Sequence, residues 1–174
     1  MAGGWIPALL LGITLSGCLH GDSAPMSLTV TSSAFAQGQP IPKQYTCSGS
    51  DLSPPLAIAG LPNGTKGLAL ILDDPDAPGG TWTHWTLWDL PPTRTNLVTG
   101  ANITSLGGVE GTTSAKSVGY HGPCPPSGTH RYFVHVWALK ETLGLPRGAS
   151  VAELRKALDA KALAQGQLMG TFSR

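Results

Sequence analysis

The sequence has few charged residues, and this scarcity excludes several classes of protein. Only 12% of the 174 residues are Asp, Glu, Lys or Arg, and the formal net charge is +1. No run of Lys and Arg offers the positive surface that holds a nucleic acid backbone, so we expect no nucleic-acid partner. The G-x-S-x-G, H-E-x-x-H, Walker and G-x-G-x-x-G motifs are also missing, so we expect neither an enzyme nor a cofactor. The length suits one domain.

Long apolar runs are missing too, and the one near the amino terminus, Ile6 to Leu15, is short. A membrane-spanning helix needs about 20 apolar residues, so this segment fits the hydrophobic region of a secretory signal. The sequence "LSGC" that follows resembles the lipobox of bacterial lipoproteins. We therefore predict a signal peptide over 1–17, a lipidated (palmitate-bearing) Cys18 and a short tether over 18–26. The alternative to a signal peptide is a buried apolar strand, because "MAGGW" contains no Lys or Arg and a strand can also end in cysteine.

Lipidation at Cys18 predicts the location of the protein. One acyl chain holds a protein at a membrane only marginally, whereas the two or three chains of a lipoprotein cysteine hold it durably. We expect the chain at the extracytoplasmic face of the bacterial cell envelope. Residue 19 is Leu rather than Asp, which favours the outer membrane where the host has one.

Cysteine is scarce, with three in the chain. With Cys18 lipidated, Cys47 and Cys124 remain, and an exported chain meets an oxidising compartment in which paired cysteines commonly bridge. We predict a Cys47–Cys124 disulfide, with two buried free thiols as the alternative.

Short apolar segments separated by Gly and Pro predict a mainly β domain followed by one helix. The pattern predicts strands over Leu28–Ser32, Gly67–Asp74, Trp82–Pro92 and His130–Leu139, and a loop over Gln37–Leu56. An S-x-x-E capping box and apolar residues at helical spacing predict a helix from about Ser150 to Leu163, ending near Gly166. This order suggests a β-sandwich or Greek-key body with a packed terminal helix.

The "DDPDAP" segment after the second strand carries the first candidate functional residues. Acidic side chains at the end of an apolar strand lie at the rim of a sheet, and the prolines restrict the loop that holds them. Carboxylates that cap an Asp-Pro turn are the alternative. His84 lies in the next strand. In the last strand, alternation places His130 and Tyr132 on one face and His135 on the other.

The blocks "DDPDAPGGTWTHW" and "GPCPPSGTHRY" resemble the two signature blocks of the phosphatidylethanolamine-binding protein family, including its bacterial branch of Raf kinase inhibitor-like proteins. "IPKQYTCSGSDLSPPL" and "LMGTF" are similar to further family segments, so the resemblance covers about Ser27 to Phe172. It implies a Greek-key β-sandwich of antiparallel sheets with a C-terminal helix over 27–174. It also implies a small surface cavity that holds phosphate, acetate or a phosphoethanolamine head group. The implied lining residues are Asp74, Asp76, His84, Gly122, Pro123, Cys124, Pro126, His130 and Tyr132. The family favours Asn where Asp51 stands here.

These residues suit the capture of an anion, such as phosphate or a phospholipid head group. Imidazoles donate hydrogen bonds, and a nearby carboxylate raises their pKa and fixes their tautomer. Asp74 would either orient a histidine or accept a bond from an ammonium group. Regulation of an envelope or secreted protease, or of another protein, is an alternative that the resemblance suggests. Asp74, His84 and His130 could in principle hold a metal, but the family is not a metalloprotein family, so we expect none. Hydrolase activity is the remaining alternative.

The predicted anchor can be tested on the purified mature protein. We expect mass spectrometry to find Cys18 as the first residue with its acyl chains attached, because signal cleavage and lipidation accompany one another at a lipobox. An intact Met1 would contradict both the signal peptide and the anchor.

Overall fold

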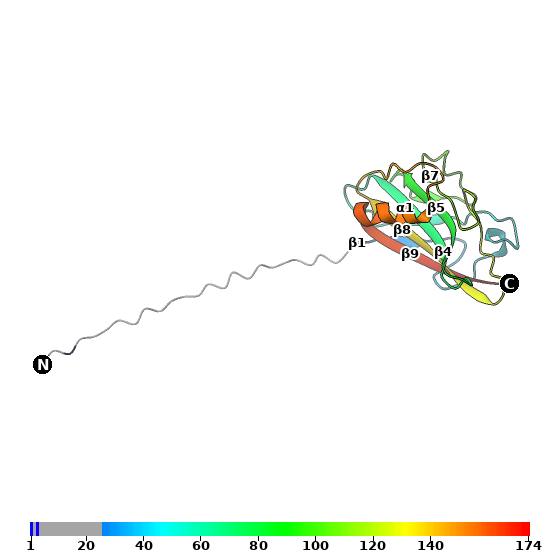
Figure 1. Ribbon diagram of the computed structural model, residues 1–174, viewed down its shortest axis with the longest axis horizontal. Coiled ribbons are helices and arrows are strands. Elements are labelled where there is room, and N and C mark those ends of the chain that lie inside the picture. The colour runs from blue at the N-terminus through cyan, green and yellow to red at the C-terminus, as the bar shows by residue number, and fades with distance from the viewer. Residues whose placement is uncertain (2, 4–25) are drawn as a thin grey trace.

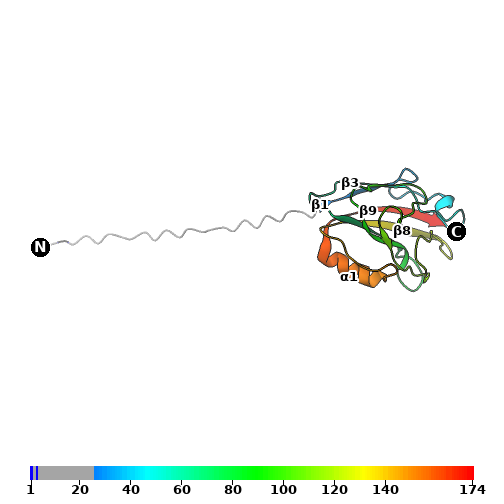
Figure 2. The same ribbon diagram turned by 90° about the horizontal axis from the view of Figure 1, so that it is seen from above.

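The computed structural model describes residues 1, 3 and 26–174, and residues 26–174 form three layers. Figure 2 shows a small β-sheet, a larger β-sheet and a helix stacked in that order. Apart from residues 1 and 3, the predicted signal peptide, Cys18 and the tether up to residue 25 lie outside the described residues. In the part of the chain that the structure describes, no helix has the length and apolar character needed to cross a bilayer.

The larger sheet has six strands in the order β1-β9-β8-β4-β5-β7 (Figure 1). These strands are β1 (Met26–Ser27), β4 (Gly67–Asp74), β5 (Trp82–Leu90), β7 (Val109–Glu110), β8 (Thr129–Leu139) and β9 (Ala162–Ser173). Neighbouring strands pair antiparallel, as predicted, except that β1 runs parallel to β9.

The smaller sheet has three antiparallel strands in the order β2-β3-β6. They are β2 (Thr29–Thr31), β3 (Leu56–Ala59) and β6 (Asn96–Leu97). The predicted loop before Leu56 contains a single turn of 3₁₀ helix, η1 (Lys43–Tyr45). Sequence patterns did not indicate β3 and β6, because two to four residues are too few to show a period.

β4 lies at the centre of the larger sheet, with β8 on one side and β5 on the other. Its alternate residues therefore enter two different cores. Leu68, Leu70 and Leu72 pack toward the smaller sheet, whereas Ala69 and Ile71 pack toward the helix. Burial on both faces explains why β4 is a continuous apolar run, and it confirms the predicted central strand.

The helix α1 (Val151–Lys161) covers part of the outer face of the larger sheet, where Leu154 and Leu158 are buried. Its start confirms the predicted capping box: Ser150 Oγ accepts from the backbone N–H of Glu153, and the Glu153 carboxylate accepts from the N–H of Ser150.

The expected end of the helix near Gly166 is wrong. α1 ends at Lys161, and the chain continues directly into β9, which pairs with β8 over nearly its whole length. Gly166 lies in this strand, where the backbone of Leu28 approaches so closely that a side chain at 166 would collide with the Leu28 carbonyl oxygen. Tertiary pairing therefore decides where the helix stops.

The capping box yields a prediction about stability. Ser150→Ala removes the acceptor for the Glu153 N–H, and we expect it to lower the free energy of unfolding by about 1 kcal/mol in chemical denaturation. Ser150→Thr keeps a hydroxyl and serves as the control. Equal stability of the Ala variant and the wild type would show that the box contributes nothing.

Candidate functional site

β4 delivers two neighbouring carboxylates to opposite faces of the larger sheet. Asp73 points toward α1, where the Arg155 guanidinium donates to it at 2.8 Å and His135 Nε2 lies 3.4 Å from it. Asp74 points to the other face and is 3% exposed. Strict alternation along the strand produces this division. Only Asp74 belongs to the candidate site.

His84 reaches the same face as Asp74 because the pairing of β4 with β5 is irregular at this point. Asp73 pairs with Thr83, but Leu72 pairs with Trp85, so β5 contains one extra residue. A bulge of this kind redirects a side chain. It places His84 beside Tyr132, with their ring centroids 5.4 Å apart.

Asp74 and His130 form a buried pair. His130 Nδ1 donates to Asp74 Oδ2 at 2.7 Å, and the other carboxylate oxygen accepts from the backbone N–H of Asp76 at 2.9 Å. Tyr132 lies on the His130 side of β8, as the alternation predicted, and its ring stacks near His130 at 6.5 Å. Burial, with the negative charge of Asp74, raises the pKa of the Tyr132 hydroxyl. Asp74 therefore orients a histidine, one of the two roles expected for it.

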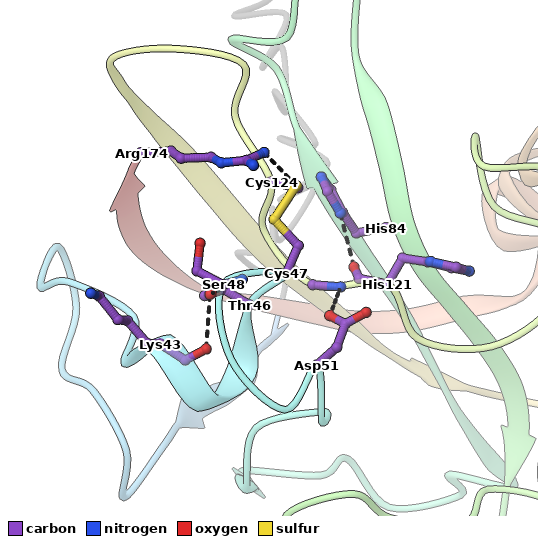
Figure 3. The surroundings of a disulfide bond; sticks show 10 residues. Lys43, Thr46, Cys47, Ser48, Asp51, His84, His121, Cys124 and Arg174 are labelled. Atoms are coloured by element: carbon purple, nitrogen blue, oxygen red, sulfur yellow. Dashed lines mark hydrogen bonds between the residues drawn. A yellow bond between two sulfur atoms is a disulfide. The ribbon is translucent and has the colours of Figure 1, made fainter.

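Two loops far apart in the sequence are joined beside these residues (Figure 3). Cys47 and Cys124 form the predicted disulfide, with Cα atoms 5.4 Å apart and a sequence separation of 77 positions. The backbone N–H of Gly122 donates to Asp51 Oδ1 at 2.7 Å, and Tyr120 donates to the carbonyl of Tyr45 at 2.6 Å. No side chain fits at Gly122, because its Cβ would lie 2.4 Å from Asp51.

These loops and the ends of β4 and β5 enclose a cavity of about 620 Å³. It is lined by Cys47, Asp51, Asp74, Ala77, Pro78, Trp82, His84, Ala115, His121, Gly122, Cys124 and Pro126. Small apolar side chains and Trp82, which is 42% exposed, surround a few polar groups. Such a composition is typical of small-molecule sites, where few polar groups fix the orientation of the ligand.

His84 is held in one tautomer. Its Nδ1 donates to the carbonyl of His121 at 2.9 Å, and the N–H of His121 donates back to the carbonyl of His84. Burial lowers the pKa of His84 below its usual 6.5, although the His121 carbonyl and Asp74 act in the opposite direction. Asp74 thus raises the pKa of this histidine, as expected of a nearby carboxylate, but burial outweighs it and the net shift is downward. Near neutral pH, Nε2 is an acceptor, and it becomes a donor only under acid conditions.

The structure brings five of the nine predicted ligand-binding residues to the cavity wall: Asp74, His84, Gly122, Cys124 and Pro126. His130 and Tyr132 lie behind this wall and contact Asp74 and His84. Pro123 is buried outside the lining, and its carbonyl accepts from the Cys47 N–H. These three contacts hold the wall in place.

Asp76 is directed away from the cavity, in contrast to its predicted place in the lining. Its carboxylate accepts three hydrogen bonds from Arg131, two from the guanidinium and one from the backbone. These bonds lower the pKa of Asp76 to about 2. Alternation on β8 places Arg131 on the outer face. The turn that follows Asp74 places Asp76 beside Arg131 on that face.

Sequence reasoning missed Asp51, His121 and Trp82 as lining residues. Asp51 was noted only because it differs from the family pattern, and its left-handed backbone (φ 55°) is an unusual feature that the sequence does not reveal. His121 directly precedes the second signature block and could have been included on that ground. Among the described residues, Asp, Glu, His and Cys form no cluster of three that could hold a metal ion.

Comparison with known proteins places this arrangement in a family. Residues 31–173 match the family described as phosphatidylethanolamine-binding protein. The chain is 42% identical over 180 residues to the UPF0098 protein PH1269 of Pyrococcus horikoshii, covering 97% of this chain and 89% of that protein. It is 45% identical over 152 residues to a UPF0098 protein of Aquifex aeolicus, covering 84% and 89%.

Solved structures give the same result. A crystal structure described as that of a putative phosphatidylethanolamine-binding protein homologue, CT736 of Chlamydia trachomatis, matches with a TM-score of 0.81 and 39% identity, covering 86% of this chain and 99% of that one. YbcL of E. coli, described as a member of the mammalian family, matches with a TM-score of 0.79 and 32% identity over 85% and 99%. The predicted sandwich with its C-terminal helix is thereby confirmed.

The disulfide yields a prediction about stability. Because it closes a long loop in the unfolded chain, we expect Cys47→Ala with Cys124→Ala to lower the free energy of unfolding by about 2–4 kcal/mol. Wild-type protein treated with a reductant should show a comparable loss in chemical denaturation. Unchanged denaturation midpoints in both samples would mean that the bridge is dispensable.

Proposed function

Because the chain belongs to the phosphatidylethanolamine-binding protein family, we propose that it is a binding protein whose cavity receives a small phosphorylated ligand, such as a phospholipid head group. The observation that carries this proposal is the cavity itself, where Asp74 and His84 meet the loop joined by Cys47–Cys124. The proposed role is binding without catalysis.

The polar groups of the cavity suit a phosphate group in contact with a histidine. Protonation of His84 Nε2 provides a charged donor, and hydrogen bonds between charged groups are roughly twice as strong as neutral ones. His130 acts through Asp74, because its Nδ1 is already bonded to that carboxylate. Pro78 and Trp82 provide apolar contacts for the carbon atoms of a ligand.

We also propose that lipidated Cys18 holds the domain at the cell envelope. β1 begins at Met26, so seven residues, and therefore eight Cα–Cα steps, separate Cys18 from the first strand. An extended chain of that length reaches at most about 29 Å, which would keep the domain close to the membrane surface.

Calorimetric titration of the protein with phosphoethanolamine tests the binding role. We expect His84→Gln to weaken binding about tenfold, the loss typical of a charged hydrogen bond, at pH 5.5. His135→Gln is the matched control, since His135 lies on the opposite face. In a second arm, the protein is titrated with a short-chain phosphatidylethanolamine, which distinguishes a lipid ligand from a soluble one. Absence of binding in both arms would end the proposal.

The same site predicts a pH dependence. Since burial lowers the pKa of His84, its proton is gained only below about pH 6.5, and affinity should rise as the pH falls from 7.5 to 5.5. For one proton coupled to binding, the affinity changes by at most about tenfold per pH unit. 2-Aminoethyl sulfate is the suitable probe, because its own charge stays constant over this range. Equal affinity at both pH values would exclude His84 as the contact.

A further inference from the structure

The outer face of β8 carries a row of three ring-bearing side chains. Phe133, His135 and Trp137 alternate with buried residues along the strand, and each of the three is half-buried. Their ring centroids lie 5.8 and 5.9 Å apart along the row. Figure 2 shows α1 on this face of the larger sheet, where its buried leucines pack with Ala69 and Ile71 of β4. The helix thus leaves the row on β8 partly open to solvent.

Two adjoining cavities, of about 490 and 560 Å³, lie over this row and are together called the outer groove. His135, Arg155 and Gln167 line both cavities, so the two are continuous. Phe133 lines the first cavity and Trp137 the second. The outer groove shares no lining residue with the cavity beside the disulfide, so the two lie apart on the molecule.

Arg155 supplies a fixed positive charge to the outer groove, and Asp73 holds it in position. Its Nη2 donates to Asp73 Oδ2 at 2.8 Å, and the exposed fractions of the two side chains are 47% and 7%. The other N–H groups of this guanidinium have no hydrogen-bond partner among the described residues. A guanidinium presents five donors in a rigid planar fork that matches a carboxylate. Arg155 is therefore oriented by one buried carboxylate and keeps donors for a second.

We propose that the outer groove is a second binding site, which takes a small carboxylate with a flat apolar body. The carboxylate of the ligand accepts hydrogen bonds from Arg155, and its body lies along the row on β8. Trp137 already donates its Nε1–H to Gln165 Oε1 at 3.2 Å, so its ring offers the ligand an apolar surface. Asp73 balances the charge of Arg155, which disfavours a doubly charged phosphate and favours a carboxylate with a single charge.

Two probes of similar shape, one charged and one neutral, test this inference. 2-Naphthoate and 2-naphthamide are titrated into the protein at pH 7, and NMR spectra of the backbone amides follow binding. We expect naphthoate to bind about five- to tenfold more tightly, because hydrogen bonds to a charged group are the stronger ones. In Arg155→Gln this ratio should fall close to one. Lys156→Gln removes the same charge from the next, exposed residue of α1 and should keep the ratio.

The spectra also locate the probe on the molecule. The rings of naphthoate should shift the amide signals of Phe133, Val151 and Gln167, which line the outer groove. Shifts confined to the cavity beside the disulfide would overturn the second site, as would an outer groove without shifts because a second copy of the chain covers it. Equal affinity for the two probes would overturn the carboxylate contact with Arg155. That comparison needs no variant, so it remains decisive even where Arg155→Gln leaves Asp73 unpaired and lowers stability.

Discussion

The double pairing of β4 is the constraint on which the candidate site depends. With β8 and β5 bonded to its two edges, the strand cannot turn, and its side chains must alternate between two cores. Asp73 and Asp74 continue that alternation at the end of the strand, so each enters a different environment. Asp73 joins Arg155 beside the helix, and Asp74 joins His130 beside the cavity. A slip of one residue would exchange their partners.

The wall of the cavity depends on contacts of long sequence separation. Cys47 and Asp51 belong to one loop, Gly122 and Cys124 to another, and a covalent bond and a hydrogen bond hold the loops together. Closing such a loop carries an entropy cost, which the disulfide reduces by restricting the unfolded chain. The absence of a side chain at Gly122 permits this approach. Contacts within the chain therefore fix the two loops that line the cavity.

Charge and burial together set the electrostatics of the cavity. Fixed negative charge comes from Asp51 and Asp74, and burial keeps His84 neutral near pH 7. The resemblance to the family implies an anion site, and histidines suit such a site because they can carry positive charge. Their burial is revealed only by the folded chain, and it lowers the pKa of His84, so that its charged form is reached only in acid.

The sequence by itself determined the central strand, the capping box at Ser150 and the face shared by His130 and Tyr132, because these follow from local periodicity. The resemblance of its two blocks was enough to indicate the family, and scarcity of cysteine indicated the Cys47–Cys124 bridge. Only the tertiary structure decided that β9 replaces the last turn of the expected helix, that Arg131 draws Asp76 away, and that Asp51 enters the cavity. Each of these features depends on a partner that is distant in sequence. The position of that partner cannot be predicted from a local sequence pattern.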